Sequence, residues 1–566
     1  MSGGYKKAQK IQKGTLSVLT MAFLCFAVQA QAQAQKNSDV PPVGTINGRV
    51  VNENGQPLAG ASLSVRAINS VSARSTTSDA EGNFRVNGLE PALYTISASL
   101  PAYTTAPSDS LIPSYYRIGD SVRLELVRGG VITGTVTNAS GEPVIQVRVR
   151  ALMIRDAKGE AVKTRGITYD ESTDDRGVYR IYGMRAGTYL VSTGGLGFSP
   201  TFNPYDDDVP TYAPSSTRDN AAEVSVRSGE ESNIDIRYRG QPGHTVSGTV
   251  KLGSNNGAAV TLVPAGGLTP VGFAYQFPGS SGFALNGIAD GDYDLAAQDL
   301  MITSAPTTIT PPTSLSEIKR ITVKGANVTG IELIPTPLPS VSGRISLESS
   351  KAPECEGKRA ALFAEMLVQP RRHEKDAARE ALFLRAFASP PLPNSSGSFV
   401  LMNLLPGRYQ FEPRFYARYW YLKSITLGKT DAAANWTVVK SGDQLKNLNI
   451  TLAEGAGSVR GRATAEASSG MTVYLVPVEA DKAEDVLRFF VTRIAADGTF
   501  AFSNLPPGRY FTLTQSAADA QTETVEKLRQ PDAAPARIKL RRAAETVKNE
   551  IELKPCQNLS DYQLKQ

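Results

Sequence analysis

Few residues in this sequence have the type and spacing that catalysis needs. The 566-residue chain contains two histidines, His244 and His373, which lie in different parts of the sequence. Two isolated histidines leave little material for a multi-histidine zinc centre or for acid–base catalysis. There is also no Gly-x-Ser-x-Gly elbow and no Ser/His/Asp arrangement. We therefore predict that the protein is not an enzyme and has no catalytic residues, metal ligands or cofactor, with His373 solvated in a charged run.

Two acidic segments are the remaining candidates for a metal site. They are residues 170–175 and 206–208. A hard cation such as Ca²⁺ needs several oxygen ligands that converge from one loop, and neither segment has the spacing of an EF-hand loop. We interpret both segments as solvated loop acids.

A cluster of aromatic residues gives the best argument for a ligand. Five of the seven residues from 415 to 421 are aromatic. Tyrosine and tryptophan rings stack on sugars and are also enriched in protein interfaces, whereas core packing is the alternative use. Alternation along a strand could bury Tyr419 and Tyr421 and leave Trp420 outside. Our candidate ligand-binding residues are Tyr416, Tyr419, Trp420 and Tyr421.

The strands expected to position the candidate residues belong to an internal sequence repeat. A short strand with a central glycine occurs five times, at intervals of the size of a domain. The five glycines are Gly48, Gly134, Gly248, Gly343 and Gly461.

Each repeat contains a second signature, in which an aromatic residue is followed ten positions later by tyrosine. A glycine shortly before the aromatic residue and a turn before the tyrosine are typical of a β-meander. The five pairs are Phe84/Tyr94, Tyr179/Tyr189, Phe283/Tyr293, Phe399/Tyr409 and Phe500/Tyr510.

Short alternating strands with frequent turns and little amphipathic helix predict an all-β chain. We expect five tandem antiparallel β-sandwiches of Ig-like or prealbumin-like type, arranged as beads on a string. Residues 375–385 are expected to form a short inserted helix, and 537–542 a basic strand. The predicted units are unit 1 (44–128), unit 2 (129–240), unit 3 (241–337), unit 4 (338–455) and unit 5 (456–554), followed by a C-terminal tail (555–566).

At this level of detail the chain resembles tandem carboxypeptidase regulatory-like domains, which are transthyretin-like or prealbumin-like sandwiches related to collagen-adhesin B-type repeats. The resemblance rests on residues 51–61 (VNENGQPLAGA), 79–84 (DAEGNF), 134–143 (GTVTNASGEP) and 505–510 (LPPGRY). It is similar to exported proteins of bacteria. The resemblance implies a β-sandwich fold and a non-catalytic accessory role, such as adhesion or ligand contact at the cell surface.

The N-terminal residues are typical of a secretory signal peptide. Four lysines precede an apolar run at 16–28, which is followed by small-x-small cleavage options at 29–34. A retained membrane anchor is the alternative, but the run is shorter than the roughly 20 residues of a span. We predict a signal peptide at 1–34, a linker at 35–43, no membrane span after cleavage, and a periplasmic, outer-surface or extracellular location.

Export and net charge together limit the classes of partner that we expect. Removing the four lysines lowers the formal charge from +6 to about +2, so we expect no nucleic-acid partner. Cys355 and Cys556 would be the two cysteines left after cleavage, and we predict that they form a disulfide that ties the tail to unit 4. We expect a structural, adhesion or protein-binding role at the cell envelope; the alternative is a carbohydrate-binding accessory protein that uses the aromatic residues of unit 4.

Overall fold

The computed structural model describes most of the chain after the predicted signal peptide. The described residues are 43–70, 72–107, 114–162, 167–195, 204–252, 257–300, 312–376, 379–384, 392–463, 471–516 and 524–564. The predicted signal peptide (1–34) and all but the last residue of the linker (35–43) lie outside them.

In the described residues, the strands form ten sheets, and each unit contains two of them. The first sheet of each unit contains the opening strand with the repeated glycine. These sheets are β4 (Asn83–Leu89), β1 (Gly44–Val51), β7 (Ser121–Arg128) and β6 (Tyr103–Thr105) in unit 1; β11 (Val178–Met184), β8 (Gly130–Thr137), β15 (Glu231–Asn233) and β16 (Ile236–Arg237) in unit 2; β20 (Phe283–Ile288), β17 (His244–Val250) and β24 (Val328–Leu333) in unit 3; β28 (Ser398–Leu401), β26 (Ser340–Glu348), β33 (Gln444–Glu454), β30 (Trp420–Leu427) and β31 (Thr430–Asp431) in unit 4; and β37 (Thr499–Leu505), β34 (Gly457–Arg462) and β40 (Asn558–Gln563) in unit 5.

The second sheet of each unit contains the strand that begins near the repeated tyrosine. These sheets are β3 (Ala73–Thr77), β2 (Ser62–Ala67) and β5 (Tyr94–Ser99) in unit 1; β10 (Thr168–Ser172), β9 (Arg148–Arg155), β12 (Gly187–Thr193), β13 (Thr211–Tyr212) and β14 (Glu223–Val226) in unit 2; β19 (Gly272–Gln276), β18 (Gly257–Pro264), β21 (Gly291–Leu300), β22 (Ser314–Ser316), β23 (Lys319–Val323) and β25 (Pro335–Pro337) in unit 3; β27 (Met366–Arg372), β29 (Gly407–Phe415) and β32 (Thr437–Val439) in unit 4; and β36 (Phe490–Arg493), β35 (Thr472–Pro477), β38 (Gly508–Gln515) and β39 (Glu550–Leu553) in unit 5.

The opening strand of each unit lies between two partner strands in its sheet. It pairs antiparallel with the strand that carries the repeated aromatic residue. On its other side it pairs parallel with a strand near the end of the unit, which we call the closing strand: β7, β15, β24, β33 and β40 in units 1 to 5. In unit 5 the parallel partner is β40, which lies in the segment expected to be a tail. β39, the last strand within the predicted bounds of unit 5, instead pairs with β38 in the second sheet. The division into five domains at the bounds given above stays a prediction.

The repeated glycine is required by close contacts on the inner face of the first sheet. A Cβ atom on Gly48 would lie 2.3 Å from the carbonyl oxygen of Val122 and 2.4 Å from Cζ of Phe84. Only a residue without a side chain lets the closing strand and the ring approach so closely. The same pairing of glycine with an aromatic residue occurs at Gly48–Phe84, Gly134–Tyr179, Gly248–Phe283, Gly343–Phe399 and Gly461–Phe500.

The repeated tyrosine closes the turn that precedes it. In every unit its hydroxyl donates a hydrogen bond to the carbonyl oxygen four residues upstream, at 2.7–2.9 Å. A tyrosine hydroxyl that enters the interior must find such an acceptor. These pairs are Tyr94–Glu90, Tyr189–Arg185, Tyr293–Ala289, Tyr409–Leu405 and Tyr510–Pro506.

Each unit encloses its own apolar core between its two sheets. In unit 1, Ile46 and Val50 of the first sheet pack with Leu63 and Val65 of the second. Corresponding clusters fill units 2 to 5. This face-to-face packing of sheets, with polar residues alternating outward, is the architecture of a β-sandwich and confirms the predicted all-β sandwich class. The sheets were expected to be antiparallel throughout, whereas the first sheet of each unit is mixed, because its opening strand has one parallel partner.

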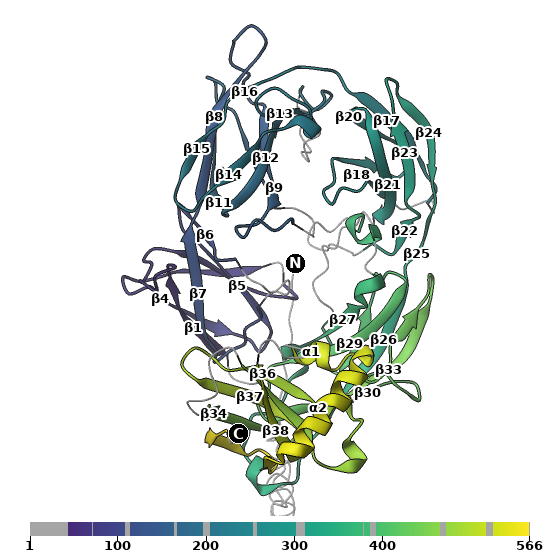
Figure 1. Cartoon of the computed structure of the whole chain (residues 1–566). Coiled ribbons are helices and arrows are strands. Elements are labelled where there is room, and N and C mark those ends of the chain that lie inside the picture. Colours follow the sequence, from purple (N-terminus) through teal and green to yellow (C-terminus); the bar gives the residue numbers. More distant parts are fainter. Residues whose placement is uncertain are drawn as a thin grey trace, which may run out of the picture.

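The units do not form a simple row of beads. Ile68, Leu93 and Tyr115 of unit 1 share an apolar cluster with Leu367 of unit 4. A second shared cluster, which includes Phe383, joins units 3 and 4. Figure 1 accordingly shows the chain folding back, so that the purple strands of unit 1 lie beside the green and yellow elements at the C-terminal end. Contacts of this kind between side chains distant in sequence leave no periodic signal, which is why the arrangement was expected to be beads on a string.

Helices are few in the described residues, and two of them correct the expectations. The described residues of the segment predicted as a helix at 375–385 form two 3₁₀ turns. The predicted basic strand at 537–542 is instead part of α2. This helix covers the outer face of the second sheet of unit 5 with Leu540 and Ala544. Leu540 and Ala544 are four positions apart, the spacing of a helix face, whereas Ile538 is exposed. No described helix is both long and apolar enough to span a membrane. The helices are α1 (Val525–Leu528), α2 (Ala534–Val547) and the 3₁₀ turns η1 (Arg218–Asn220), η2 (Pro353–Cys355), η3 (Phe363–Glu365), η4 (Glu374–Asp376), η5 (Arg379–Leu382), η6 (Ala480–Lys482), η7 (Val486–Arg488) and η8 (Pro531–Ala533).

Candidate binding surface

The aromatic cluster of unit 4 is packed into the structure rather than displayed on it. Trp420, expected outside, is 2% exposed and belongs to the core of unit 4. The alternation along β30 has the opposite parity to the expected one, so that Trp420 and Leu422 point inward. Tyr419 and Tyr421 are half-buried, and burial raises the pKa of the Tyr421 hydroxyl. An exposed plane of rings around Trp420 is therefore absent from the described residues.

Tyr416 and Tyr419 lie at contacts between units. Tyr416 packs against the apolar cluster shared by units 1 and 4, and burial raises the pKa of its hydroxyl. The side-chain amide of Asn558, on β40 of the first sheet of unit 5, donates to the Tyr419 hydroxyl at 3.5 Å. Within unit 4, the Lys358 ammonium lies 5.0 Å from the centre of the Tyr419 ring. The backbone of Trp420 also takes part in such a contact, because the Asn504 side chain of unit 5 donates to its carbonyl oxygen at 2.7 Å. The aromatic cluster thus serves the assembly of the units.

The two cysteines predicted to remain after export lie together. Cys355, in η2 of unit 4, is bonded to Cys556, which lies between β39 and β40. Both are buried, and 201 positions separate them in the sequence. The bond ties unit 4 to the closing strand of unit 5.

The two histidines bond to carboxylates and backbone groups in the described residues, and not to a nucleophilic side chain. His373 is buried at the contact of units 4 and 5, where its Nε2 lies 2.8 Å from Asp532 Oδ2 and its Nδ1 accepts from the backbone N–H of Lys375. The expectation of a solvated His373 was wrong, because the sequence does not show that η8 covers it. His244 pairs with Asp290 at 3.2 Å. No serine, threonine or cysteine side chain is hydrogen-bonded to either histidine in the described part of the chain.

The acidic segments do not gather into a metal site in the part of the chain that the structure describes. That part contains no group of three or more His, Cys, Asp or Glu side chains placed to hold a metal ion. Asp174 instead accepts hydrogen bonds from the backbone N–H groups of Arg176 and Val178. These bonds, together with Arg176, hold the pKa of Asp174 below its ordinary value and fix the turn.

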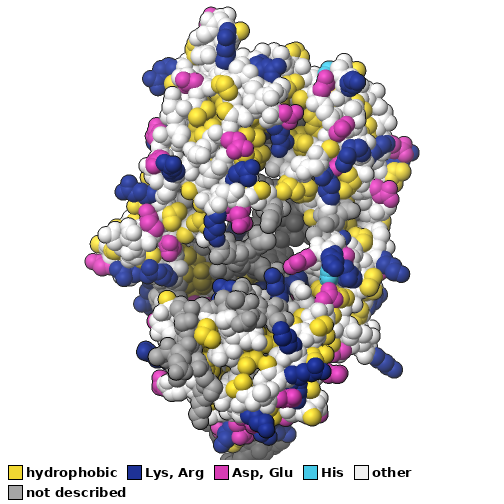
Figure 2. All heavy atoms as spheres, viewed as in Figure 1, with side chains coloured by type: hydrophobic (Ala, Val, Ile, Leu, Met, Phe, Trp, Pro, Cys, Tyr) yellow, Lys and Arg dark blue, Asp and Glu magenta, His cyan; other side chains and the backbone are white. Residues whose placement is uncertain are grey.

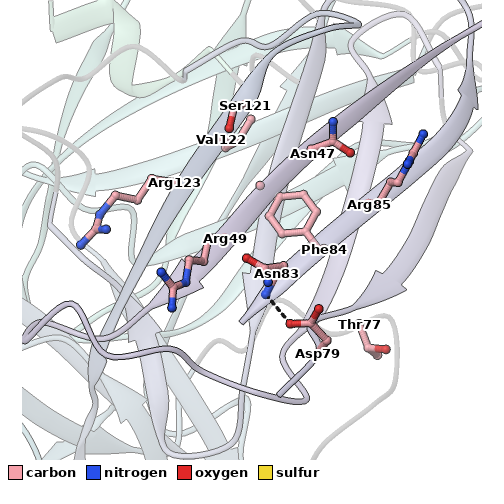
Figure 3. A pocket seen from close by; sticks show the side chains of 11 residues that line it. Asn47, Arg49, Thr77, Asp79, Asn83, Phe84, Arg85, Ser121, Val122 and Arg123 are labelled. Atoms are coloured by element: carbon pink, nitrogen blue, oxygen red, sulfur yellow. Dashed lines mark hydrogen bonds between the residues drawn. The ribbon is translucent and has the colours of Figure 1, made fainter. Parts of the chain in front are cut away.

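A polar surface of unit 1 is the strongest candidate for binding. It is the outer face of three neighbouring strands, β4, β1 and β7, and it borders a hollow of about 780 Å³ (Figure 3). We call it the arginine face. Its outward side chains are Asn47 and Arg49 on β1, Asn83 and Arg85 on β4, and Ser121 and Arg123 on β7.

The pairing of the strands sets the positions of the three arginines. Arg49 lies opposite Arg123 across the parallel pair β1–β7, and Arg85 lies opposite Asn47 across the antiparallel pair β1–β4. Figure 3 shows Arg49 and Arg123 projecting side by side, with Arg85 on the far side of Asn47. Three cations are thus held on one rigid face.

The arginine face differs from the corresponding faces of units 2 and 3 in its charge balance. In unit 2, Arg180 pairs with Glu231 at 2.8 Å; in unit 3, Lys251 pairs with Glu332 at 2.8 Å. None of the three arginines of unit 1 forms an ion pair with another described residue. On the side of the molecule shown in Figure 2, basic and acidic side chains are interspersed. Among the corresponding faces of units 1 to 3, the face of unit 1 is thus the one on which three arginines have no ion pair with a described residue.

A weaker version of this surface occurs in unit 4. Arg344 on β26 takes the place of Arg49, and Asn449 takes the place of Arg123. Lys446 adds a second cation to a hollow of about 600 Å³. The same part of the sandwich thus forms a polar, cation-bearing hollow in two units.

The sequence contains a signal for the arginine face that the search for motifs missed. Its three strands carry the triplets Asn-Gly-Arg (47–49), Asn-Phe-Arg (83–85) and Ser-Val-Arg (121–123). In each triplet, polar and basic residues alternate with an inward residue, as on a half-buried strand. The triplets point to a common surface only once the strands are known to be neighbours.

Residues 45–113 match the family model of the carboxypeptidase regulatory-like domain. This segment lies in unit 1, and the match confirms the resemblance noted in the sequence. No curated protein matches the chain.

Several solved structures are similar to parts of the chain at low sequence identity. The TIE protein of Bacillus anthracis is 15% identical over 52% of this chain and 50% of its own, with a TM-score of 0.14. The shaft pilin SpaA of Lactobacillus rhamnosus GG is 11% identical over 35% and 98%, with a TM-score of 0.16. Two B repeat units of the collagen-binding protein of Staphylococcus aureus are 10% identical over 73% and 99%, with a TM-score of 0.13. The chain spans about half of the TIE protein, and TM-scores this low carry no functional argument.

Proposed function

We propose that this chain is an exported, non-catalytic β-sandwich protein with a structural or adhesive role at the cell envelope. The repeated glycine, aromatic and tyrosine residues all act in the scaffold, where they pack strands together and close turns. Function is therefore assigned to surfaces that the scaffold holds in place. The partner of this role is a protein or a glycan outside the cytoplasm.

One observation carries the proposal: the units are joined by contacts beyond neighbours in the sequence. Arg117 of unit 1 pairs with Glu365 of unit 4 at 3.7 Å, beside the apolar cluster that includes Tyr115 and Leu367. The Glu365 side chain is 3% exposed and pairs also with Arg359. A buried, charge-paired contact between distant units stiffens the chain, and a stiff body suits load-bearing or the presentation of a surface.

Small-angle X-ray scattering of the mature protein tests this closed arrangement. A compact chain of this size has a radius of gyration of about 24 Å, whereas five beads in a row would give about 50 Å. The double variant Tyr115→Ala/Arg117→Ala should increase the radius, because it removes the unit 1 side of the contact. The matched control Tyr182→Ala, at a tyrosine that is 61% exposed, should leave it unchanged. A wild-type radius near that of the row would refute the proposal of a stiff body.

Export is tested separately by fractionation of producing cells. We expect the protein in the periplasm, at the outer surface or in the medium, with a mature N-terminus near residue 35. A cytoplasmic protein that retains residues 1–34 would contradict the envelope role.

A further inference from the structure

We propose that the arginine face of unit 1 is a docking surface for an acidic polysaccharide, whose carboxylates are bound by Arg49, Arg85 and Arg123. This inference deepens the adhesive role proposed above and rests on it. It starts from the lack of ion pairs on this face, which distinguishes unit 1 from units 2 and 3.

The arginines are anchored in a way that leaves their terminal nitrogens available. Arg49 donates through Nε to the carbonyl oxygen of Glu81 at 2.9 Å, and Arg85 donates through Nε to Asn87 Oδ1 at 2.8 Å. Neither contact uses the two terminal NH₂ groups, which form the fork that binds a carboxylate. The Arg123 side chain has no hydrogen bond or ion pair with another described residue. Arg49 and Arg85 are therefore positioned without being neutralised, and the Arg123 guanidinium is not neutralised either.

The spacing of the arginines suits repeated charges on one linear chain. Neighbouring strands lie about 4.8 Å apart, so Arg49 and Arg123 form a close cross-strand pair. The Cα atom of Arg85 is one strand from that of Arg49 and two residues along, about 8 Å away. The Arg85 guanidinium points away from those of Arg49 and Arg123, so the three cations are spread along the face (Figure 3). A linear polymer with an acidic group on successive sugar units could meet several of these cations at once, which raises its affinity over that of a single anion.

The other side chains of the face favour a polysaccharide over a folded protein. The exposed large hydrophobic residues of the described chain include none on β1, β4 or β7. A protein partner would bury a dehydrated apolar centre, which this face lacks. Asn47, Asn83 and Ser121 instead provide amide and hydroxyl groups that can hydrogen-bond to sugar hydroxyls. Two acids lie at the edge of the face: Asp79, which lines the hollow and accepts hydrogen bonds from the backbone N–H groups of Glu81 and Asn83, and Glu125, two positions beyond Arg123. The three arginines outnumber them, so positive charge prevails.

Binding of polygalacturonate to the mature protein tests the inference, with calorimetry as the measurement. The wild type should bind polygalacturonate but not neutral dextran, and binding should weaken between about 50 and 300 mM NaCl because the salt screens exposed charges. The variant Arg49→Gln/Arg85→Gln/Arg123→Gln should bind at least about tenfold more weakly. The matched control is Arg66→Gln/Arg418→Gln/Arg542→Gln, which removes the same charge from exposed arginines that lie outside the arginine face and its counterparts in other units, and it should change the affinity less than about twofold.

Three outcomes would overturn the inference. They are no binding of polygalacturonate at low salt, an equal loss in the two triple variants, and tighter binding of polyglutamate than of polygalacturonate, which would assign the face to an acidic protein segment. Circular dichroism of each variant verifies folding, and glutamine keeps the length and polarity of the side chain. Scattering and fractionation test the stiff exported body independently, so that a failure of this inference can be told apart from a failure of the proposed function.

Discussion

The hydroxyl of Tyr510 donates a hydrogen bond to the carbonyl oxygen of Pro506, 2.8 Å away. Tyr510 is completely buried, so the bond satisfies two polar groups that water does not reach. It ties β38 to the turn that precedes it, and the tyrosine at the same position of every other unit makes the same bond. The tyrosine that recurs ten residues after each aromatic residue is thus a fastening of the scaffold.

Removing this hydroxyl should destabilise unit 5. Tyr510→Phe leaves the Pro506 carbonyl oxygen without its partner and should lower the free energy of unfolding by about 1–2 kcal/mol. Differential scanning calorimetry of the mature protein measures the effect as a lower transition temperature. The control Tyr182→Phe alters an exposed hydroxyl and should leave the transition in place. Equal transitions in the two variants would show that the bond contributes nothing.

The same tyrosines predict a loss of stability in alkaline solution. Burial raises the pKa of Tyr293 to about 12, and it also raises the pKa values of Tyr94, Tyr189, Tyr409 and Tyr510. In the unfolded chain a tyrosine ionises near pH 10. The stabilisation is therefore fully present below about pH 10 and is lost as the pH rises through the higher pKa values of the folded state.

Urea unfolding at a series of pH values, with phenolate absorbance as a second readout, checks this dependence. The unfolding midpoint should stay constant up to about pH 9 and fall above about pH 10. If all tyrosines ionised reversibly near pH 10 in a protein that remained folded, the repeated tyrosines would not be buried as described.

The sandwich fold could be predicted because its signals are local. A strand that alternates around Gly134, an aromatic residue at 179 and a tyrosine at 189 each mark one step of the backbone. The structure shows why they recur, since Gly134 and Tyr179 are direct partners across β8 and β11. The position at which a side chain would clash is therefore occupied by glycine in the sequence of every unit.

The surfaces and contacts between units could not be predicted in the same way. The side of β30 on which Trp420 lies depends on the register between β30 and β33, which alternation alone does not reveal. β40 was expected to be part of a tail because its parallel partner, β34, is about 100 residues away in the sequence. The arginine face likewise needs three strands to be brought together, so its residues stand out only in the folded chain.

Substitution of Gly48 should disrupt unit 1. In Gly48→Ala the added carbon would lie 2.3 Å from the backbone oxygen of Val122, which cannot move without opening the parallel pair β1–β7. We expect the free energy of unfolding of unit 1 to fall by several kcal/mol, because the added carbon presses on backbone atoms and not on a flexible side chain. The control is Gly60→Ala, where a Cβ meets nothing within 4 Å and the cost, about 1–2 kcal/mol, comes from the positive φ alone. Proteolysis of unit 1 compares the two variants, and equal resistance would contradict the role of Gly48.

Trp420 should prove to be a core residue by its effect on stability. Trp420→Ala leaves a cavity in unit 4 and should lower the free energy of unfolding by about 3–5 kcal/mol. Polygalacturonate binding by the folded fraction should be unchanged, because the proposed surface lies in unit 1. The control Trp436→Ala removes a half-buried ring at the contact of units 4 and 5 and should cost less. A stable Trp420→Ala protein that lost glycan binding would restore the original interpretation of the aromatic cluster.

The disulfide between Cys355 and Cys556 should hold the closing strand of unit 5 in place. Cys556 lies two positions before the first residue of β40, and its backbone N–H also donates to the carbonyl oxygen of Gly455, the last residue of unit 4. Because the bond closes a loop of about 200 residues, the double variant Cys355→Ser/Cys556→Ser should lose about 2–5 kcal/mol. Hydrogen exchange should then speed up in residues 558–563 while unit 2, which has no contact with the bond, keeps its protection. Reduction of the wild type should reproduce the variant, whereas two titratable thiols in the native secreted protein would show that the bond does not form.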